Sequence, residues 1–516
     1  SITAQYFAAK AAVGFSTGLR HALFEHIQKL SFSEMDTVGT STLITRMTSD
    51  INQTQNGVNL VLRLFLRSPF IVFGAMIMAF TIDVKAALVF VVTIPLLSVV
   101  VFGIMLVSIP LYKKVQSALD KVLGITRENL TGSRVIRAFN KEDDEIADFN
   151  NSNDALTKIQ LYVGKISALM NPLTYVIING AVVVLVWTGA IRVNSGYITQ
   201  GEVVALVNYM SQILVELIKL ANLIININKS IACGNRIQAI FELQPSITDH
   251  AVTPVAEEKT EHSGEVPEVV FSHVGLTYAG AGEESLTDID FTVKKGETIG
   301  IIGGTGSGKS SVVNLIPRFY DATKGSVQIE GKDVREYSLE ELRGKIGMVL
   351  QKAVLFKGTI RENMLWGNEN ATDEAIMQAL EVAQAKEFVD KKEGGLDFEI
   401  EQGGKNLSGG QRQRMTIARA VVKKPDILIL DDSASALDFA TDAKLRMAIR
   451  DMENKATVFI VSQRAASIMY ADKIIVLDDG QIVGMGTHEE LLKQCEVYQE
   501  IYYSQFKKTE DEKEGR

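Results

Sequence analysis

The chain has 516 residues, of which 46% are apolar, 22% charged and 7% aromatic, which excludes a wholly disordered protein and allows two to four domains. Its formal charge of −9, from 53 basic and 62 acidic residues, argues against binding of nucleic acid by bulk positive charge, and we expect no nucleic-acid partner. The only two cysteines, Cys233 and Cys495, exclude a disulfide scaffold.

The apolar residues are concentrated in the first half of the sequence. Ala86–Tyr112 and Ile166–Ile191 are charge-free over 27 and 26 residues, and a membrane-spanning helix needs about 20. Ser68–Ile82 is shorter, Val203–Ile227 is interrupted by two charges, and Ile2–Ile27 is a weaker candidate with several basic residues. The sequence thus predicts five candidate spans, and long core helices of a soluble bundle are the alternative.

The charges in the loops orient these spans. Seven basic residues follow the Ala86–Tyr112 run, whereas the connections Asp83–Lys85 and Arg192–Gln200 hold one each. By the positive-inside rule the basic side is cytoplasmic. Helical periodicity continues past the apolar runs, so we expect the helices to project well beyond the bilayer.

The sequence pattern changes after the membrane segments and indicates four parts. Residues 1–243 are the expected transmembrane domain, and residues 244–267 lack apolar periodicity and are expected to be a linker. In residues 268–506 short β-branched runs alternate with amphipathic stretches, which is typical of an α/β domain. Residues 507–516 are a charged tail. The predicted fold is an all-α transmembrane bundle followed by an α/β domain.

The start of the α/β domain contains a phosphate-binding motif in its required context. An apolar strand at Thr298–Ile302 precedes G-x-x-x-x-G-K-S, and Ser311–Ile316 follows as a helix. In such a loop glycines let backbone N–H groups surround phosphate oxygens, while the lysine contacts the β- and γ-phosphates and the serine holds Mg²⁺. We therefore expect ATP and Mg²⁺ as cofactors, bound by Gly303, Gly304, Thr305, Gly306, Ser307, Gly308, Lys309, Ser310 and Ser311.

A second apolar strand, Ile427–Asp431, ends in an acid. This pattern suits a carboxylate that completes the Mg²⁺ site, the Walker B aspartate. Taken alone, an acid at a strand end is equally compatible with structural capping. Its occurrence after a phosphate-binding loop favours Asp431 as a metal ligand.

Between these motifs lies Leu407–Gln411, which reads L-S-G-G-Q. With it, the chain resembles the ATP-binding cassette (ABC) transporter family over nearly its whole length. The order, membrane helices first and one cassette after them, is that of type IV exporter half-transporters. The family has six spans in each half, and since five candidates are found here, the resemblance implies that the first span is missing from this sequence.

The resemblance implies roles for further residues, each of which taken singly also suits ordinary core or surface use. Tyr278 matches the aromatic residue that stacks on adenine, and Gln351 matches the glutamine that contacts Mg²⁺ and senses the membrane domain. Glu399 matches the acid of the exporter-specific loop, although Gln402 replaces its usual second acid. The D-loop corresponds to Ser435–Asp438, and the expected coupling segments are Phe32–Val38 and Phe139–Asn153.

In this family two cassettes dimerise head to tail, so each ATP lies between one chain's P-loop and the other chain's signature. The resemblance therefore implies a second half-transporter as partner, within a lipid bilayer. It also implies a multi-pass protein of the plasma or inner membrane whose nucleotide-binding domain is cytoplasmic.

Two positions depart from the family pattern, and both concern hydrolysis. Asp432 stands where the family has a glutamate general base, and Gln463 stands where it has the switch histidine. The signature residues Ser408, Gly409, Gly410 and Gln411 are intact. The pattern resembles the degenerate-site subunit of bacterial heterodimeric multidrug exporters, in which this chain's own ATP site turns over slowly. Two tolerated substitutions in a homodimer are the alternative.

The membrane half does not name a substrate. Glu216 and Lys219 lie three residues apart and are expected either to pair with each other or to contact cargo. By analogy we expect export of small amphipathic, drug-like molecules. The alternatives are a lipid or peptide exporter and an ATP-gated regulatory membrane module that transports nothing.

Overall fold

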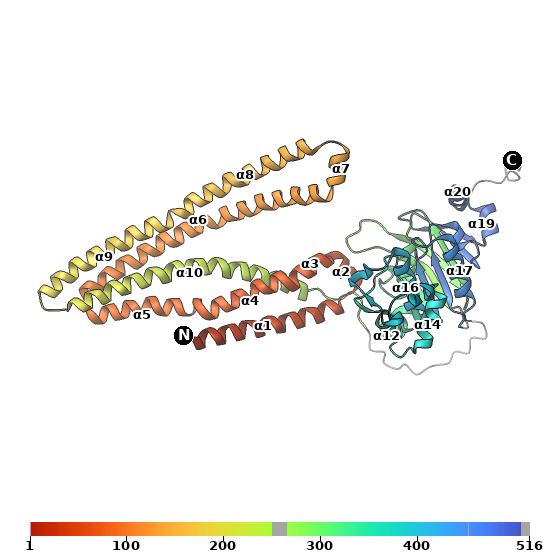
Figure 1. The fold of residues 1–516 in the computed structure, drawn as a ribbon, viewed down its shortest axis with the longest axis horizontal. Helices are drawn as coiled ribbons and strands as arrows, with labels where there is room; N and C mark the ends of the chain where they lie inside the picture. The colour runs from red at the N-terminus through yellow and green to blue at the C-terminus, as the bar shows by residue number, and fades with distance from the viewer. Residues whose placement is uncertain (1, 250–265, 453, 507–516) are drawn as a thin grey trace. The chain divides into compact units, whose positions relative to one another are not determined.

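The computed structural model describes residues 2–249, 266–452 and 454–506 (Figure 1). The chain divides into two compact units. The helical unit comprises Ser1–Gln28 and Thr40–Leu243, and the α/β unit comprises Lys29–Gly39 and Gln244–Arg516. Most of the expected linker 244–267 and all of the expected tail 507–516 lie outside the described residues.

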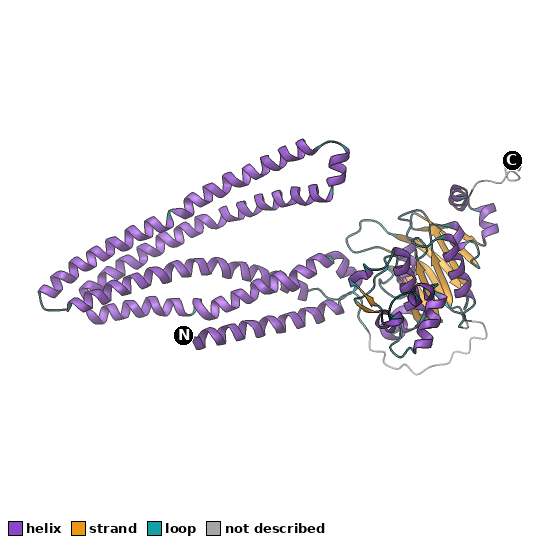
Figure 2. Ribbon diagram, in the orientation of Figure 1, coloured by secondary structure: helices purple, strands orange, loops and turns teal. Residues whose placement is uncertain are grey.

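Long helices build the helical unit, and no strand is drawn in it (Figure 2). In chain order the helices and two π-helical segments are α1 (Ile2–Lys29), α3 (Thr40–Thr45), η1 (Arg46–Asp50), α4 (Ile51–Leu60), η2 (Val61–Phe65), α5 (Arg67–Ile82), α6 (Val84–Thr131), α7 (Ser133–Ala138), α8 (Glu142–Ala168), α9 (Met170–Asn194) and α10 (Gln200–Phe241). Helix α10 packs on α4, α5 and α9, while α6 runs alongside α8 and α9 (Figure 1).

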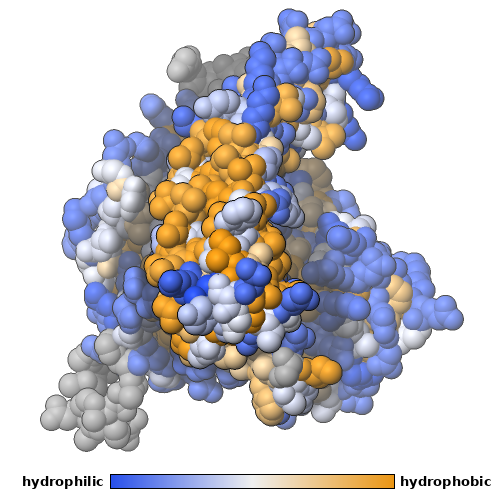
Figure 3. All heavy atoms as spheres, turned by 90° about the vertical axis from the view of Figure 1, so that its left-hand side faces the viewer, coloured by the Kyte–Doolittle hydropathy of each residue, from blue (hydrophilic) through white to orange (hydrophobic). Residues whose placement is uncertain are grey.

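Within the described residues, four helical stretches are long and apolar enough to cross a membrane, namely Thr40–Ile82, Val84–Thr131, Glu142–Asn194 and Gln200–Leu220. They contain three of the four stronger apolar runs of the sequence and residues 203–220 of the fourth. The fifth candidate forms the continuous helix α1 but is not among them, because Lys10, Arg20 and His21 lower its apolar character. In Figure 3, orange apolar residues flank a small polar patch at the end of the helical unit that faces the viewer.

The helices are much longer than a bilayer is thick. Helix α6 has 48 residues, which at about 1.5 Å per residue exceeds twice the roughly 30 Å of hydrocarbon. Its far end is followed by the short helix α7, so the turn lies at residues 132–141 rather than at the expected Phe139–Asn153. The prediction was wrong there because Gly132 ends α6, and the four acids Glu142–Glu145 favour a helix N-terminus at the start of α8.

Buried charges in the helical unit are paired across helices. Asp50 accepts hydrogen bonds from Arg236 at 2.6 and 3.0 Å and from Arg46 at 2.8 Å. Glu216, which is 5% exposed, accepts from Ser68 Oγ at 2.9 Å and from Lys219 Nζ at 3.0 Å. The pairing of Glu216 with Lys219 expected from their spacing is therefore present.

The α/β unit contains α2 (Phe32–Val38) and all strands of the part of the chain that the structure describes. The strands are β1 (Val269–Leu276), β2 (Leu286–Val293), β3 (Thr298–Gly303), β4 (Lys324–Ile329), β5 (Lys332–Asp333), β6 (Ile346–Val349), β7 (Gly358–Thr359), β8 (Glu399–Ile400), β9 (Ile427–Asp431), β10 (Thr457–Val461), β11 (Lys473–Asp478) and β12 (Gln481–Gly486). Its further helices are α11 (Lys309–Leu315), η3 (Val334–Glu336), α12 (Leu339–Lys345), α13 (Ile360–Leu365), α14 (Asp373–Val382), α15 (Lys386–Asp390), η4 (Gly395–Asp397), η5 (Gln402–Gly404), α16 (Gly409–Val421), α17 (Phe439–Arg450), α18 (Ala465–Ile468), α19 (His488–Gln494) and α20 (Glu496–Gln505).

A six-stranded sheet, in the order β12-β11-β3-β10-β9-β6, forms the centre of this unit. All neighbouring pairs are parallel except β11 with β12. Every residue of β9 and β10 is buried, as expected for parallel strands covered on both faces. A four-stranded sheet, β2-β1-β4-β5, is antiparallel.

The first expected coupling segment, Phe32–Val38, is a helix of the α/β unit. Its N-terminus is closed by a capping box between Ser31 and Glu34. The ring of Phe32 lies 4.5 Å from that of Phe319, and the Tyr320 hydroxyl donates to the carboxylate of Asp36. These contacts explain why α2 groups with the α/β unit rather than with the helices on either side of it in the sequence.

Candidate nucleotide site

The site is assembled by the carboxyl ends of three adjacent parallel strands. Strand β3 ends at Gly303, β9 ends at Asp431, and β10 ends at Val461, which is paired with Asp431 and with Ile301. The loops that leave these strands therefore start at one edge of the sheet. Ligands of open α/β sheets bind at this edge.

The loop after β3 has a conformation that needs glycine. Gly306 and Gly308 have φ of +87° and +91°, and a Cβ on Gly308 would lie 2.6 Å from Leu286 Cδ2. A Cβ on Gly303 would lie 2.1 Å from the carbonyl oxygen of Leu477. The loop leads directly into α11, whose first residue is Lys309. It therefore has the strand-loop-helix form of a phosphate cradle.

Lys309 is folded back onto this loop. Its side chain is buried, and Nζ donates to the carbonyl oxygens of Gly303, at 3.0 Å, and Gly304, and to Ser307 Oγ at 3.3 Å. Burial lowers the pKa of Lys309. A cation held here by loop carbonyls is available to exchange these partners for phosphate oxygens.

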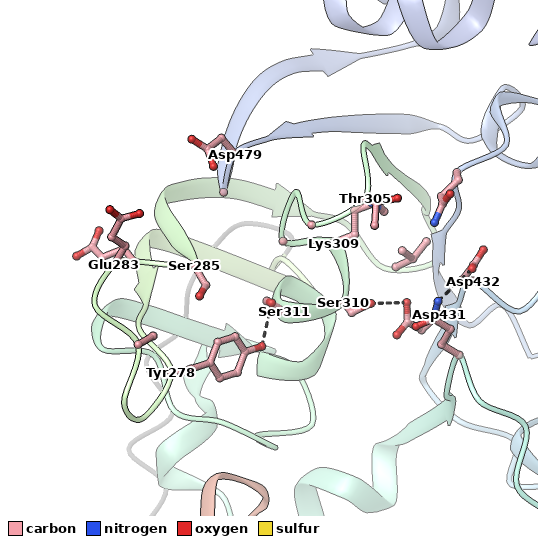
Figure 4. Close-up of a pocket in the computed structure, with 18 of the residues that line it drawn as sticks. Tyr278, Glu283, Ser285, Thr305, Lys309, Ser310, Ser311, Asp431, Asp432 and Asp479 are labelled. Atoms are coloured by element: carbon pink, nitrogen blue, oxygen red, sulfur yellow. Dashed lines mark hydrogen bonds between the residues drawn. The ribbon is translucent and has the colours of Figure 1, made fainter. Parts of the chain in front are cut away.

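A hydroxyl and a carboxylate next to the loop suit a Mg²⁺ ion. Ser310 Oγ donates to Asp431 Oδ1 at 3.0 Å (Figure 4). Asp431 is buried, and this burial raises the pKa of its carboxyl. Among the described residues no group of three His, Cys, Asp or Glu side chains could hold a metal. The Ser310 hydroxyl and the Asp431 carboxylate fit Mg²⁺, which is usually held by one or two protein oxygens together with phosphates and water.

Tyr278 lies at the other end of the site. Its hydroxyl donates to Ser311 Oγ at 2.9 Å (Figure 4). Its ring meets that of Tyr320 edge-on at a centroid distance of 5.0 Å. The hydroxyl is removed from water, and this burial raises the pKa of Tyr278. The ring is thus held beside the first turn of α11.

These side chains line one cavity of about 820 Å³. The predicted site residues in its wall are Tyr278, Thr305, Gly306, Gly308, Lys309, Ser310, Ser311, Gln351, Asp431, Asp432 and Gln463. Gly303, Gly304 and Ser307 are not in the wall, although they accept hydrogen bonds from Lys309. The sequence therefore identified most of the wall of this cavity.

Sequence reasoning missed two segments that line the cavity, the loop 281–285 and the turn Asp479–Gly480. The Asp-Gly pair is a hairpin-turn signal between β11 and β12 and could have been found. The Gly480 carbonyl accepts from Thr287 N at 2.9 Å, so strand β2 fixes this turn. The loop 281–285 carries no comparable signal.

Asp432, directly after β9, has an unusual backbone. Its φ is +45°, a left-handed conformation that Asp tolerates better than most residues, and its N–H donates to Val461 O at 3.0 Å. Its carboxylate accepts from Gln351 Nε2 at 3.3 Å. Three predicted residues, Gln351, Asp431 and Asp432, thus lie together at the cavity wall.

The signature segment lies elsewhere in the chain's own fold. Ser408 caps α16, because its Oγ accepts from Gln411 N at 3.3 Å and its N–H donates to Gln411 Oε1 at 3.0 Å. None of Ser408, Gly409, Gly410 and Gln411 is in the wall of the described cavity, and Ser408 and Gly409 are exposed. The structure of one chain therefore does not bring the signature to the phosphate loop.

An apolar helical unit followed by a P-loop α/β unit defines an ATP-driven membrane transporter. Residues 1–217 match the family model of the ABC transporter transmembrane region, and residues 286–435 match the ABC transporter family model. A Mycobacterium tuberculosis protein named as an uncharacterized ABC transporter ATP-binding protein is 38% identical over 98% of this chain and 86% of its own length. The chain belongs to the ABC transporter family.

Other relatives carry more specific names. A putative multidrug export ATP-binding/permease protein of Bacillus subtilis is 34% identical over 96% of this chain and 85% of its own length. An ATP-dependent lipid A-core flippase of Desulfotalea psychrophila is 33% identical over 94% and 84%. The solved structure of a bacterial Atm1-family ABC exporter with ATP bound matches 97% of this chain and 87% of its own, with a TM-score of 0.78 at 23% identity, which shows the shared fold.

The chain thus combines the transmembrane region and the P-loop α/β unit of an ATP-driven ABC transporter. It is a multi-pass membrane protein whose nucleotide-binding domain, here the α/β unit, is cytoplasmic. Exporters of this family work as dimers in a lipid bilayer, and the ATPase domain implies ATP binding.

Proposed function

We propose that this chain is the degenerate-site half of a heterodimeric exporter that moves small amphipathic molecules out of the cytoplasm or the inner leaflet. Its own phosphate loop holds ATP with slow turnover, and its signature completes the active site of a non-identical partner. The observation that carries the proposal is the presence of Asp432 and Gln463 together in the wall of one cavity.

Both residues weaken hydrolysis for a physical reason. Aspartate is one methylene shorter than the glutamate general base of the family, which withdraws the carboxylate from the attacking water by about 1 Å and costs roughly 100-fold in rate. Glutamine can hydrogen-bond a γ-phosphate but has neither the charge nor the proton-handling capacity of histidine. Because the two changes act on one site in one direction, they support a binding role for it.

Binding itself needs none of the missing groups. We assign the triphosphate to the loop 303–310 and Lys309, the adenine to Tyr278, and Mg²⁺ to Ser310, Asp431 and Gln351. Mg²⁺, when bound, neutralises charge on the β- and γ-phosphates. The hydrogen bond between Ser310 and Asp431 supports this assignment, because it holds two oxygen ligands 3.0 Å apart.

The position of the signature supports a trans role. Ser408 and Gly409 are exposed and lie outside the cavity of their own chain, so Ser408, Gly409, Gly410 and Gln411 are free to face a second cassette. There they would donate to the γ-phosphate of the partner's ATP, which is held by the partner's own phosphate loop. ATP hydrolysis would thus be slow at this chain's own site, whereas its signature would fully support hydrolysis at the partner's site.

A lipid exporter is the second candidate, and one cluster in the helical unit favours it. Glu216 faces two cations, with Lys219 Nζ at 3.0 Å and Arg67 at 3.6 Å, and both cationic side chains remain nearly half exposed. One carboxylate cannot neutralise two cations, and the excess positive charge suits an anionic headgroup. Stimulation of ATP hydrolysis by an anionic lipid, but not by cationic amphipathic dyes, would favour this candidate.

The first experiment is the composition and activity of the purified native complex. Native mass spectrometry of the tagged full-length chain is expected to show two different chains in equal amounts, together with ATP hydrolysis. A catalytically active dimer of this chain alone would contradict the heterodimer.

The second experiment restores the missing groups. In single-turnover assays, the double variant Asp432→Glu, Gln463→His is expected to raise hydrolysis at this chain's own site by at least about tenfold. The gain is below the full 100-fold because glutamate tolerates the left-handed backbone of position 432 less well than aspartate. No gain at this site would refute the geometric argument.

A further inference from the structure

The C-terminal helix α20 reaches the loop that carries Gln463. Gln505, the last residue of α20, donates from Nε2 to the carbonyl oxygen of Gln463 at 2.8 Å. Its Oε1 accepts from the backbone N–H of Ala465 at 2.9 Å. One amide side chain thus bonds to the peptide groups on both sides of Arg464.

These two bonds restrict the loop in a way that one bond would not. The Gln463 carbonyl and the Ala465 N–H belong to successive peptide groups, and each can rotate only by breaking its bond to Gln505. Inside the loop, Ser462 N donates to Ile301 O at 3.0 Å and Arg464 N donates to Ser462 Oγ at 2.9 Å. Residues 462–465 therefore have a defined backbone at the cavity wall.

The loop is also tied to the D-loop, the segment Ser435–Asp438. The Arg464 guanidinium donates to the carbonyl oxygens of Ala434, Ser435 and Leu437 at 3.4, 3.1 and 3.2 Å. Its cation lies 5.1 Å from the ring centroid of Phe439. Movement of the backbone at Arg464 would therefore disturb the D-loop as well as Gln463.

Helix α20 is itself firmly anchored, so Gln505 is a fixed point. Tyr498 is fully buried and its hydroxyl lies 2.7 Å from His488 Nδ1. The ring of Tyr502 lies 5.2 Å from that of His488, which belongs to α19. Helix α20 also lies against α18 and strands β3 and β11 of the central sheet. The exposed amide of Gln505 is thus presented from the end of a helix that packs on the central sheet.

We propose that Gln505 is a positioning residue of the nucleotide site, which holds the backbone of residues 463–465 so that the Gln463 amide meets the γ-phosphate of ATP. This inference rests on the role proposed above for Gln463. Since ADP lacks a γ-phosphate, the bonds of Gln505 raise the affinity for ATP and not for ADP. The C-terminal helix thereby sets how well this chain's site distinguishes the two nucleotides.

The test uses the full-length complex and three variants. Gln505→Met keeps the side-chain length and removes both bonds, and Gln505→Glu keeps the bond to Ala465 but loses the donor to Gln463. Gln499→Met is the matched control, because Gln499 lies on the same helix and donates to Leu492 O at 2.9 Å, away from the loop. Nucleotide affinity at this chain's site is measured by photolabelling with 8-azido-ATP in competition with ATP or ADP, after the chains are separated by mass.

Gln505→Met is expected to weaken ATP binding about fivefold and to change ADP binding less than twofold, since each lost hydrogen bond to the backbone is of modest strength. Gln505→Glu sets a carboxylate oxygen against the Gln463 carbonyl oxygen and is expected to weaken ATP binding at least as much, whereas Gln499→Met should not weaken it. Hydrogen exchange in a peptide covering residues 463–468 should be faster at Ala465 in Gln505→Met and unchanged in Gln505→Glu.

Gln463→Ala separates the two proposals. If it lowers ATP affinity relative to ADP while Gln505→Met does not, the positioning role of Gln505 is wrong and the role of Gln463 stands. If neither variant changes the discrimination, the γ-phosphate contact of Gln463 is wrong, and the role of Gln505 is refuted with it. Unchanged exchange at Ala465 in Gln505→Met would contradict the geometry directly.

Discussion

Glu268 is a buried carboxyl group that the nucleotide site does not use. It is 2% exposed, and its Oε1 has no hydrogen-bond partner. Burial is the main reason that the pKa of Glu268 is raised, with Glu330 and Asp426 raising it further and Lys295 and Lys345 opposing them. An unpaired carboxylate in this position costs free energy of folding whenever it is ionised.

Replacing this carboxyl by an amide should therefore stabilise the protein at neutral pH. Because the pKa is higher in the folded chain than in the unfolded chain, the folded state binds the proton more tightly, and wild-type stability is lost as pH rises through the raised value. We expect Glu268→Gln to add about 1 kcal/mol at neutral pH, or roughly 2–4 °C in Tm. The gain should shrink as pH falls toward 4.5, the ordinary pKa of glutamate.

Thermal unfolding of the purified complex across this pH range measures the effect. Glu387→Gln is the control, since Glu387 is exposed, is paired with Lys391 at 2.6 Å and is not among the charges that shift the pKa of Glu268, so this variant should gain nothing. An equal gain at every pH would show that the charge of Glu268 is not the cause.

At the scale of helices, small residues hold α4 against α10. The Cβ that an alanine would add at Gly57 lies 2.3 Å from Ser230 Cβ, and Ser230 Oγ donates to Gln53 O at 2.7 Å. Close approach through small side chains is a common way for helices to associate in a membrane protein. Further along the same pair of helices, the bond between Asp50 and Arg236 ties α10 to the start of α4.

Gly57→Ala is expected to push these helices apart. Overpacking of this kind costs about 1–3 kcal/mol, so the variant should lower the Tm of the complex. Gly74→Ala in α5 is the control, because a Cβ there meets nothing within 4 Å. The double variant Gly57→Ala, Ser230→Gly should recover part of the loss; without any recovery, the contact with Ser230 is not its cause.

At the scale of the whole transporter, the proposed asymmetry means that the phosphate loop and the signature of this chain serve two ATP sites with different hydrolysis rates. Lys309 would serve the slow site of this chain, and Ser408 would serve the fast site of its partner. Ser408→Ala is expected to lower steady-state ATP hydrolysis by about 100-fold, the cost of one donor to a transition-state phosphate. Lys309→Ala should lower it less than tenfold, because it affects only nucleotide held at the slow site.

The loss of a helix cap must be separated from this effect, since Ser408 also caps α16. Ser338→Ala is the matched control, because Ser338 caps α12 in the same unit through its bond to Glu341 N at 3.1 Å. It is expected to leave hydrolysis unchanged while lowering stability by about 1 kcal/mol. Equal losses from Ser408→Ala and Lys309→Ala would count against an asymmetric dimer.

Several features of this protein could be predicted from residue order alone, because their physical causes are local. An apolar run of about 20 residues is long enough to span a bilayer, and four of the five candidates lie wholly or largely in helices of that length and composition. The phosphate loop is a second case. Its glycines are needed for positive φ at Gly306 and Gly308, and they lie in one short segment. Strands β3 and β9 were predicted for the same reason.

Other features depend on contacts between distant segments and were decided only by the tertiary structure. The family resemblance placed Asp432 and Gln463 at one site, and the parallel register explains how they reach one cavity with the phosphate loop. Nothing in the sequence indicated that α20 brings Gln505 to the loop 42 residues before it. The position of α7 and the grouping of α2 with the α/β unit also escaped the sequence pattern. Local patterns determine which residues are apolar, flexible or able to bind phosphate. Only the packing of strands and helices decides which of them meet, because a hydrogen bond between distant residues leaves no periodicity in the sequence.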